Sequence, residues 1–181
     1  MLPLGHMGIT FAATRVLEKL LKQQRVDYRL LLTSSLLPDI IDKTSGLLLS
    51  AGHKLGDKSW GHSLIFLALI LGIILIQRQK RCNTINAETI LFGSAVHDLL
   101  DTMWHFPEIL FWPVGHLIFS TPPYEAWAGT IHLGVFKITE LFSFEIIGGC
   151  ILTYFLFRLV LNSRIIYFIS TGKLTRDAST L

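Results

Sequence analysis

Charged residues are scarce in this chain of 181 residues. Asp, Glu, Lys and Arg make up 16% of it, whereas a soluble domain carries roughly 25%. Apolar residues make up 51%, so the chain also lacks the low hydrophobicity and high charge of a disordered protein. So few charges cannot cover the surface of an ordinary soluble domain. We therefore expect a small integral membrane protein.

Cysteine and clustered basic residues are sparse as well. The two cysteines lie in different surroundings, Cys82 in a basic stretch and Cys150 in an apolar run, and no CxxC motif is present. This pattern argues against a disulfide and against a thiolate metal site. The net charge is only +3, and the basic residues are spread out rather than gathered on one face, so we expect no nucleic acid partner. The first residues lack a secretory signal pattern, which favours insertion over export.

Apolar residues instead gather in five blocks, at 8–21, 30–37, 60–76, 88–105 and 141–161. A membrane span needs about 20 residues, so the first two blocks leave open a hairpin buried only partway through the bilayer. The last block is interrupted by Glu145 and Arg158, which could pair with other helices. The pattern predicts an all-α integral membrane helical bundle with about four to five membrane-embedded helices. We expect a single domain over residues 1–170 and a polar tail over 171–181.

The basic residues predict how these blocks are oriented across the membrane. Eleven of the 16 lie at alternate ends of the blocks, four lie at the opposite ends, and Arg15 lies within the first block. Basic loops stay in the cytoplasm. The sequence therefore predicts a multi-pass membrane protein whose N-terminus is outside and whose C-terminus is inside.

Titratable residues form groups at the ends of these blocks, where they are costly and usually functional. The groups are His6, Asp39 with Asp42, His62, and His97 with Asp98 and Asp101. The orientation set by Lys and Arg places all of them on the non-cytoplasmic face. Spacings of i, i+4 and i, i+3 put His97 and Asp101, and Asp39 and Asp42, on shared helix faces. Imidazoles and carboxylates without thiolates suit zinc, manganese or another divalent metal.

Each residue taken alone also has a simpler explanation. Asp39 follows a proline and could be only a helix N-cap. Asp98 points about 100° away from His97 on a helix, which fits a supporting or solvent-facing group. A lone histidine such as His53, His116 or His132 is more often a polar tip at the headgroups. The convergence of four groups favours a metal site.

The order of the short motifs resembles the YdjM-like family of membrane-associated, metal-dependent hydrolases, some of them LexA-regulated proteins of the bacterial inner membrane. The motifs are His6…Thr10, Leu-Leu-Pro38-Asp39-Ile-Ile-Asp42, Gly61-His62-Ser63, His97-Asp-Leu-Leu-Asp101 and Phe111-Trp112-Pro113. They cover about residues 1–120. The family is in turn thought to be distantly similar to zinc-dependent phospholipase C, an all-helical fold whose histidines and aspartates bind a metal cluster. The chain departs from the family pattern at Trp60-Gly61 and at Asp98.

The resemblance implies a set of metal ligands and an activity. The implied ligands are His6, Asp39, His62, His97 and Asp101. A metal-activated water would hydrolyse a phosphoester, with Asp42 as a further ligand or the general base and with Asp101 in the catalytic set. Asp98 and His105 are expected to orient the imidazoles of the ligands. The aromatic stretch 106–129 suits an interface belt or a lid.

The sequence also predicts partners for the protein, and two alternative functions remain open. The expected partners are membrane lipid and an amphiphilic or lipid-linked substrate, with the headgroup and the oligomeric state open. One rival is a membrane protein that binds metal for structure or transport, without a reaction. The other is a redox protein with haem between facing histidines, although haem sites do not call for the surrounding carboxylates.

Overall fold

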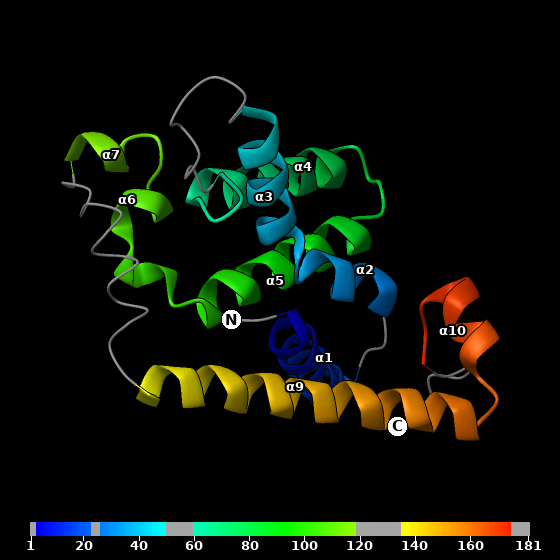
Figure 1. Cartoon of the computed structure of the whole chain (residues 1–181). Coiled ribbons are helices and arrows are strands. Elements are labelled where there is room, and N and C mark those ends of the chain that lie inside the picture. Colours follow the sequence, from blue (N-terminus) through cyan, green and yellow to red (C-terminus); the bar gives the residue numbers. More distant parts are fainter. Residues whose placement is uncertain (1–2, 23–25, 50–59, 119–134, 175–181) are drawn as a thin grey trace.

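The computed structural model describes residues 3–22, 26–49, 60–118 and 135–174, and all regular elements in these ranges are helical (Figure 1). They are α1 (Pro3–Leu21), α2 (Tyr28–Ser34), α3 (Leu37–Leu49), α4 (Leu64–Gln79), α5 (Ile85–Leu100), a 3₁₀ turn (Met103–His105), α6 (Pro107–Leu110), α7 (Gly115–Ile118), α9 (Val135–Leu161) and α10 (Ile165–Thr171). Part of the expected aromatic lid (119–129), most of the tail (175–181), His53 and His132 lie outside the described residues.

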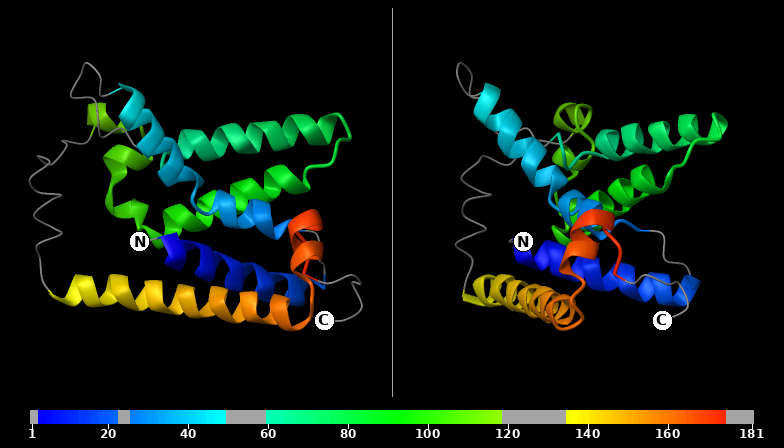
Figure 2. Two further views of the ribbon diagram at one scale, coloured as in Figure 1. Left: turned by 45° about the vertical axis from the view of Figure 1, so that its right-hand side comes forward. Right: turned by 90° about the vertical axis from the view of Figure 1, so that its right-hand side faces the viewer.

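The helices pack in pairs that run back and forth. The helix α1 lies along α9, and α5 packs between α2 and α4. Figure 2 shows that α1, α4 and α9 run in one direction, while α2 and α5 return. The last turns of α1, α4 and α9 carry Lys19, Arg78 and Arg158. The molecule therefore has one basic end and an opposite end where α1 and α4 begin and α5 finishes.

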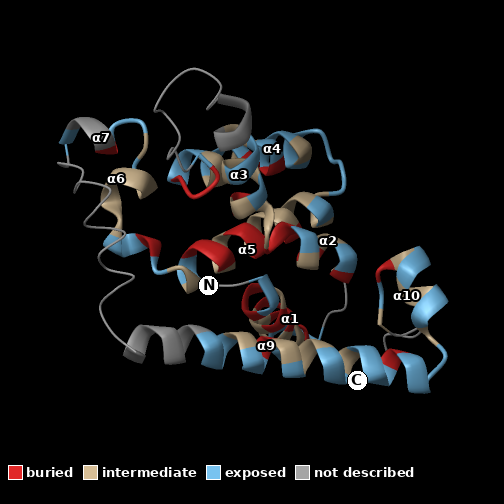
Figure 3. Ribbon diagram, viewed as in Figure 1, coloured by how far each residue is buried: buried red, intermediate tan, exposed pale blue. Residues whose placement is uncertain are grey.

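Local sequence explains where these helices begin. The carboxylate of Asp27 accepts hydrogen bonds from the N–H groups of Arg29 and Leu30 and so caps α2. The hydroxyl of Ser63 accepts from the N–H of Phe66 and caps α4. Both are residue types that N-caps favour. Figure 3 shows that the buried residues gather on α5, α1 and the turn before α4, at the centre of the molecule.

The prediction of four to five membrane-embedded helices is wrong, although the helical class is confirmed. Within the described residues, only Phe142–Leu161 of α9 is long and apolar enough to cross a membrane. The apolar helix α4 has 16 residues, which at 1.5 Å per residue is about 24 Å, less than the roughly 30 Å of a hydrocarbon core. The block 88–105 breaks because α5 ends at Leu100 and Thr102 takes a left-handed conformation with φ of 55°.

Candidate metal centre

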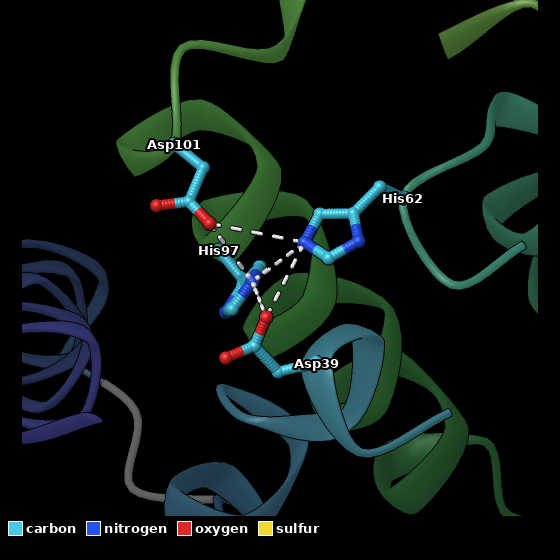
Figure 4. Close-up of side chains that lie close together, drawn as sticks. All are labelled: Asp39, His62, His97 and Asp101. Atoms are coloured by element: carbon cyan, nitrogen blue, oxygen red, sulfur yellow. Dashed lines mark hydrogen bonds and ion pairs between the residues drawn. The ribbon is translucent and has the colours of Figure 1, made fainter. Parts of the chain in front are cut away.

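Three segments of the chain bring four of the predicted ligands to the end opposite the basic turns. Asp39 lies in the first turn of α3, His97 in the last turn of α5, and Asp101 is the C-cap residue of α5. His62 comes from the turn that precedes α4. Figure 4 shows their four side chains pointing toward one another. Residues that are 62 positions apart in sequence, from Asp39 to Asp101, therefore share one site.

The spacing of the four ligand atoms fits a single ion. The Nε2 atoms of His62 and His97 are 3.0 Å apart, and Nε2 of His97 lies 3.3 Å from Oδ2 of Asp101. Oδ1 of Asp39 lies 3.8 Å from each Nε2, and Oδ2 of Asp101 lies 3.8 Å from Nε2 of His62. Tetrahedral ligands at about 2.0–2.1 Å from an ion lie about 3.3–3.4 Å from each other. The group could therefore hold a metal ion.

The other ring nitrogen of each histidine is already engaged. Nδ1 of His97 lies 2.7 Å from the backbone carbonyl of Ser35, which can only accept, so Nδ1 carries the proton. Nδ1 of His62 lies 2.5 Å from Oδ2 of Asp42 and donates to that carboxylate. When the rings are neutral, both Nε2 atoms therefore direct a lone pair into the site. Such outer partners of metal-bound histidines fix the tautomer and the ring orientation.

The charges of the site favour a cation. Burial opposes the charged form of His62, but the hydrogen bonds to Asp101 and Asp42 outweigh it and raise the pKa of His62 to about 9. Burial likewise opposes ionisation of Asp101, yet its contacts with three imidazoles hold the pKa of this carboxyl far below its usual range. In the absence of a metal, a proton on His62 would balance the carboxylates. A divalent cation can take the place of that proton.

A close backbone contact brings the His62 turn against α3. A Cβ atom added to Gly61 would lie 2.4 Å from the carbonyl oxygen of Pro38, so only glycine fits here. The N–H of Gly61 donates to Oδ1 of Asp42 at 2.7 Å. Asp42 therefore holds both the backbone and the imidazole of the His62 turn, and its carboxylate lies behind the ligand nitrogen. In the expected set, Asp42 was a further ligand or the general base.

His6 lies beside the four-ligand group. Its side chain is fully buried, its ring stacks on His97 with centroids 4.0 Å apart, and its Nε2 is 3.2 Å from Oδ1 of Asp101. Neither ring nitrogen of His6 has a hydrogen bond that meets geometric criteria among the described residues. Burial lowers the pKa of His6, which keeps the ring neutral. His6 thus meets Oδ1 of Asp101, the carboxylate whose Oδ2 faces the ligand nitrogens.

The two expected supporting groups differ: Asp98 lies beside the site without a hydrogen bond to an imidazole among the described residues, and His105 lies at the surface. Asp98 is 6% exposed, and within the described part of the chain neither of its carboxylate oxygens has a hydrogen-bond partner. Burial raises the pKa of Asp98 to about 7. His105 is exposed and contacts Trp104. The partners that orient the imidazoles are instead Asp42 and the carbonyl of Ser35, and a backbone carbonyl leaves no signal in a sequence.

The comparisons with known proteins give one match. The model of the YdjM inner membrane protein family matches residues 1–169. No curated protein matches the chain, and no solved structure does. The matched range contains all the residues of the site, from His6 to Asp101, and the candidate membrane span of α9. The chain belongs to the YdjM inner membrane protein family.

Proposed function

We propose that this protein is a membrane-bound, metal-dependent hydrolase that cleaves a phosphoester of a lipid or a lipid-linked molecule. One observation carries the proposal. Two buried imidazoles bring their Nε2 atoms within 3.0 Å of each other, with carboxylate oxygens of Asp39 and Asp101 beside them. Two imidazole nitrogens at that distance need a shared proton or a cation between them, and the two carboxylates favour a divalent cation in that place.

The donor set fits zinc, and manganese is the second candidate. Two neutral nitrogens and two carboxylate oxygens neutralise a divalent ion and match its preferred ligands. A divalent ion held there would lower the pKa of a bound water to about 7. The ion would also polarise a phosphoryl oxygen of the substrate. Asp42 keeps His62 in the required tautomer, and the carbonyl of Ser35 does so for His97. Nε2 of His6 contacts the second oxygen of Asp101 at 3.2 Å, which makes His6 the fifth residue of the centre.

An anionic substrate would approach from the side of the carboxylates. His97 is fully buried, whereas the side chains of Asp39 and Asp101 are 25% and 18% exposed. On that open side, Nζ of Lys43 lies 3.1 Å from Oδ2 of Asp39, and the Lys43 side chain is 75% exposed. A phosphate oxygen that displaces this exposed ion pair would gain a cation at little cost. This arrangement supports a phosphoester over a neutral ester.

The charges that flank α9 support a site on the non-cytoplasmic side. Arg158 lies in the last turn of α9, and Arg164 and Lys173 follow it, so this end is expected in the cytoplasm. The metal centre lies toward the opposite end of α9. With Cys82 and Cys150 replaced by serine, a membrane-impermeant thiol reagent should label Lys43→Cys in intact cells and spare Lys173→Cys. Labelling of Lys173→Cys alone would place the chemistry in the cytoplasm.

A structural metal site is the second candidate. Four protein ligands are typical of closed structural zinc sites, whereas catalytic sites keep a position for water. The partial exposure of both carboxylates favours the catalytic form, because one of them can yield its place or a fifth ligand can enter. Haem fits poorly, since two Nε2 atoms 3.0 Å apart leave no room for a porphyrin between them.

The experiment is a hydrolysis assay on the zinc-loaded protein in vesicles of anionic phospholipid, with bis(p-nitrophenyl) phosphate as a soluble substrate. Wild type and His105→Ala, an exposed histidine outside the site, should release product at equal rates. Asp101→Asn should lose activity because it removes a charged ligand. Metal bound without turnover of either substrate would favour the structural site, and equal activity in Asp101→Asn would refute the assignment of the centre.

A further inference from the structure

An acidic side chain from the membrane helix caps the helix that carries His6. Glu145 belongs to the candidate span Phe142–Leu161 of α9. Its Oε1 accepts a hydrogen bond from the N–H of Leu4 at 3.0 Å, and its Oε2 accepts from the N–H of Gly5 at 2.8 Å. Both oxygens of one carboxylate are thus used by the first turn of α1, next to His6.

The sequence of α1 makes this cap necessary. The helix begins at Pro3, which has no N–H, so the N–H groups that follow are the first that need acceptors. Along a membrane span little water is present to satisfy them, and an unsatisfied group there costs several kcal/mol. A carboxylate at this position satisfies two donors and also meets the positive end of the helix dipole.

Close backbone contact fixes the same two helices at a second point. A Cβ atom added to Gly8 would lie 2.3 Å from the carbonyl oxygen of Gly148, and one added to Gly148 would lie 2.3 Å from that of Leu4. Glycine on both sides lets membrane helices approach until their backbones touch. The hydrogen bonds of Glu145 and this crossing together set the height and the rotation of α1 against α9.

We propose that Glu145 is a positioning residue of the metal centre: through the first turn of α1 it holds His6 against Asp101, and the membrane helix is thereby part of the site. The inference rests on the proposed function only in requiring that the centre binds a metal. Nε2 of His6 lies 3.2 Å from Oδ1 of Asp101, and the ring stacks on His97. A shift of α1 along α9 would break both contacts.

A double-mutant cycle on the full-length protein in detergent separates positioning from general loosening. Zinc is titrated into the apo-protein against a chromophoric chelator. Loss of a group that orients a ligand typically costs 10- to 100-fold in metal affinity, so Glu145→Gln and His6→Ala should each weaken zinc binding by at least about tenfold. If Glu145 acts through His6, the double variant binds zinc no more weakly than His6→Ala does.

Neighbouring glycines supply a matched pair of controls. Gly148→Ala inserts a methyl group into the α1–α9 contact, whereas a methyl group at Gly149 would meet only the side chain of Leu4, at 3.8 Å. Zinc affinity should fall in Gly148→Ala and stay at the wild-type value in Gly149→Ala. The absorption spectrum of the cobalt-loaded protein should change in the same way in Glu145→Gln, Gly148→Ala and His6→Ala.

Three outcomes would overturn the inference. If the effects of Glu145→Gln and His6→Ala multiply in the double variant, Glu145 stabilises the protein without positioning His6. If zinc affinity is unchanged in Glu145→Gln while His97→Ala abolishes binding, the cluster binds metal but Glu145 of α9 does not position His6. Absence of zinc binding in the wild type would overturn both this inference and the proposed function.

Discussion

Two buried polar clusters lie at opposite ends of α1, and they differ in how their carboxylates are balanced. At the basic end, the hydroxyl of Tyr28 donates to Oε2 of Glu18, and the guanidinium of Arg15 lies 3.5 Å from the same oxygen. Burial and the contact with Glu18 raise the pKa of Tyr28 well above its ordinary value, so its hydroxyl keeps the proton that it donates. Carboxylate, cation and donor are all supplied by the chain.

The cluster at the other end gathers carboxylates and imidazoles, and no arginine contacts them among the described residues. The permanent cation that the structure places near it among the described residues is Lys43, whose side chain is 75% exposed. Buried charges are tolerated when they are paired or when they coordinate a metal. The first cluster is thus paired with arginine, whereas the mixed imidazole and carboxylate donors of the second suit a divalent cation.

The largest difference between the clusters should be the response of stability to zinc. A ligand that binds only the folded state at 1,000 times its Kd stabilises it by about 4 kcal/mol. Zinc should therefore raise the unfolding temperature of the wild type and of Glu18→Gln, as followed by circular dichroism in detergent. His62→Ala should lose this increase. An equal zinc effect in His62→Ala would place the binding site elsewhere.

A smaller effect is expected when the support of a ligand is weakened. Asp42→Asn removes the carboxylate that holds Nδ1 of His62 and should lower zinc affinity 10- to 100-fold. Asp98→Asn should cost less than about tenfold, because Asp98 has no hydrogen bond to an imidazole among the described residues. Competition with a chelator measures both variants. A larger loss in Asp98→Asn would reverse the roles that the geometry gives them.

The cluster at the basic end should affect stability alone. Tyr28→Phe leaves the buried carboxylate of Glu18 with one donor fewer, which costs about 1–3 kcal/mol. Chemical unfolding should show this loss, while zinc affinity stays at the wild-type value. Tyr154→Phe, on the exposed face of α9, is the control and should change neither quantity. A fall of zinc affinity in Tyr28→Phe would show that the two clusters are coupled.

The smallest effect concerns the cap of α2 and its pH dependence. The hydrogen bond from Arg29 lowers the pKa of Asp27, so the unfolded state binds the proton more tightly. The stability that Asp27 contributes is thus present above its ordinary pKa of about 4 and is lost as the pH falls through the lower pKa of the folded state. Asp27→Ala should cost about 1 kcal/mol at pH 7. The difference from wild type should shrink in acid and should not depend on zinc.

Several features of the site could be predicted from the sequence because they follow from spacing. His97 and Asp101 are one helical turn apart, and the structure brings Asp39 and His62 next to them. The membrane face that the basic residues predict for the group stays a prediction. The role of Asp42 could not be predicted, since a carboxylate near a ligand can bind metal, take a proton or hold an imidazole. Only the distance to Nδ1 of His62 distinguishes these roles.

The predicted number of membrane spans was wrong for a different reason. Hydropathy registers how many apolar residues follow one another, but it does not register where a helix ends. The fourth apolar block reached the expected length only by including Asp101 to His105, which lie beyond the end of α5. Likewise, Glu145 could be predicted to pair with another helix, but its partners are backbone N–H groups of α1, which every sequence contains.

The central claim is that the His/Asp cluster binds a metal ion, and the metal content of the purified protein tests it most directly. The wild type, His97→Ala and His105→Ala are dialysed against a chelator, reloaded with zinc, freed of excess ion and analysed by mass spectrometry for metal per chain. We expect tightly bound zinc in the wild type and in His105→Ala, and its loss in His97→Ala. Equal metal content in all three proteins, or none in the wild type, would contradict the claim.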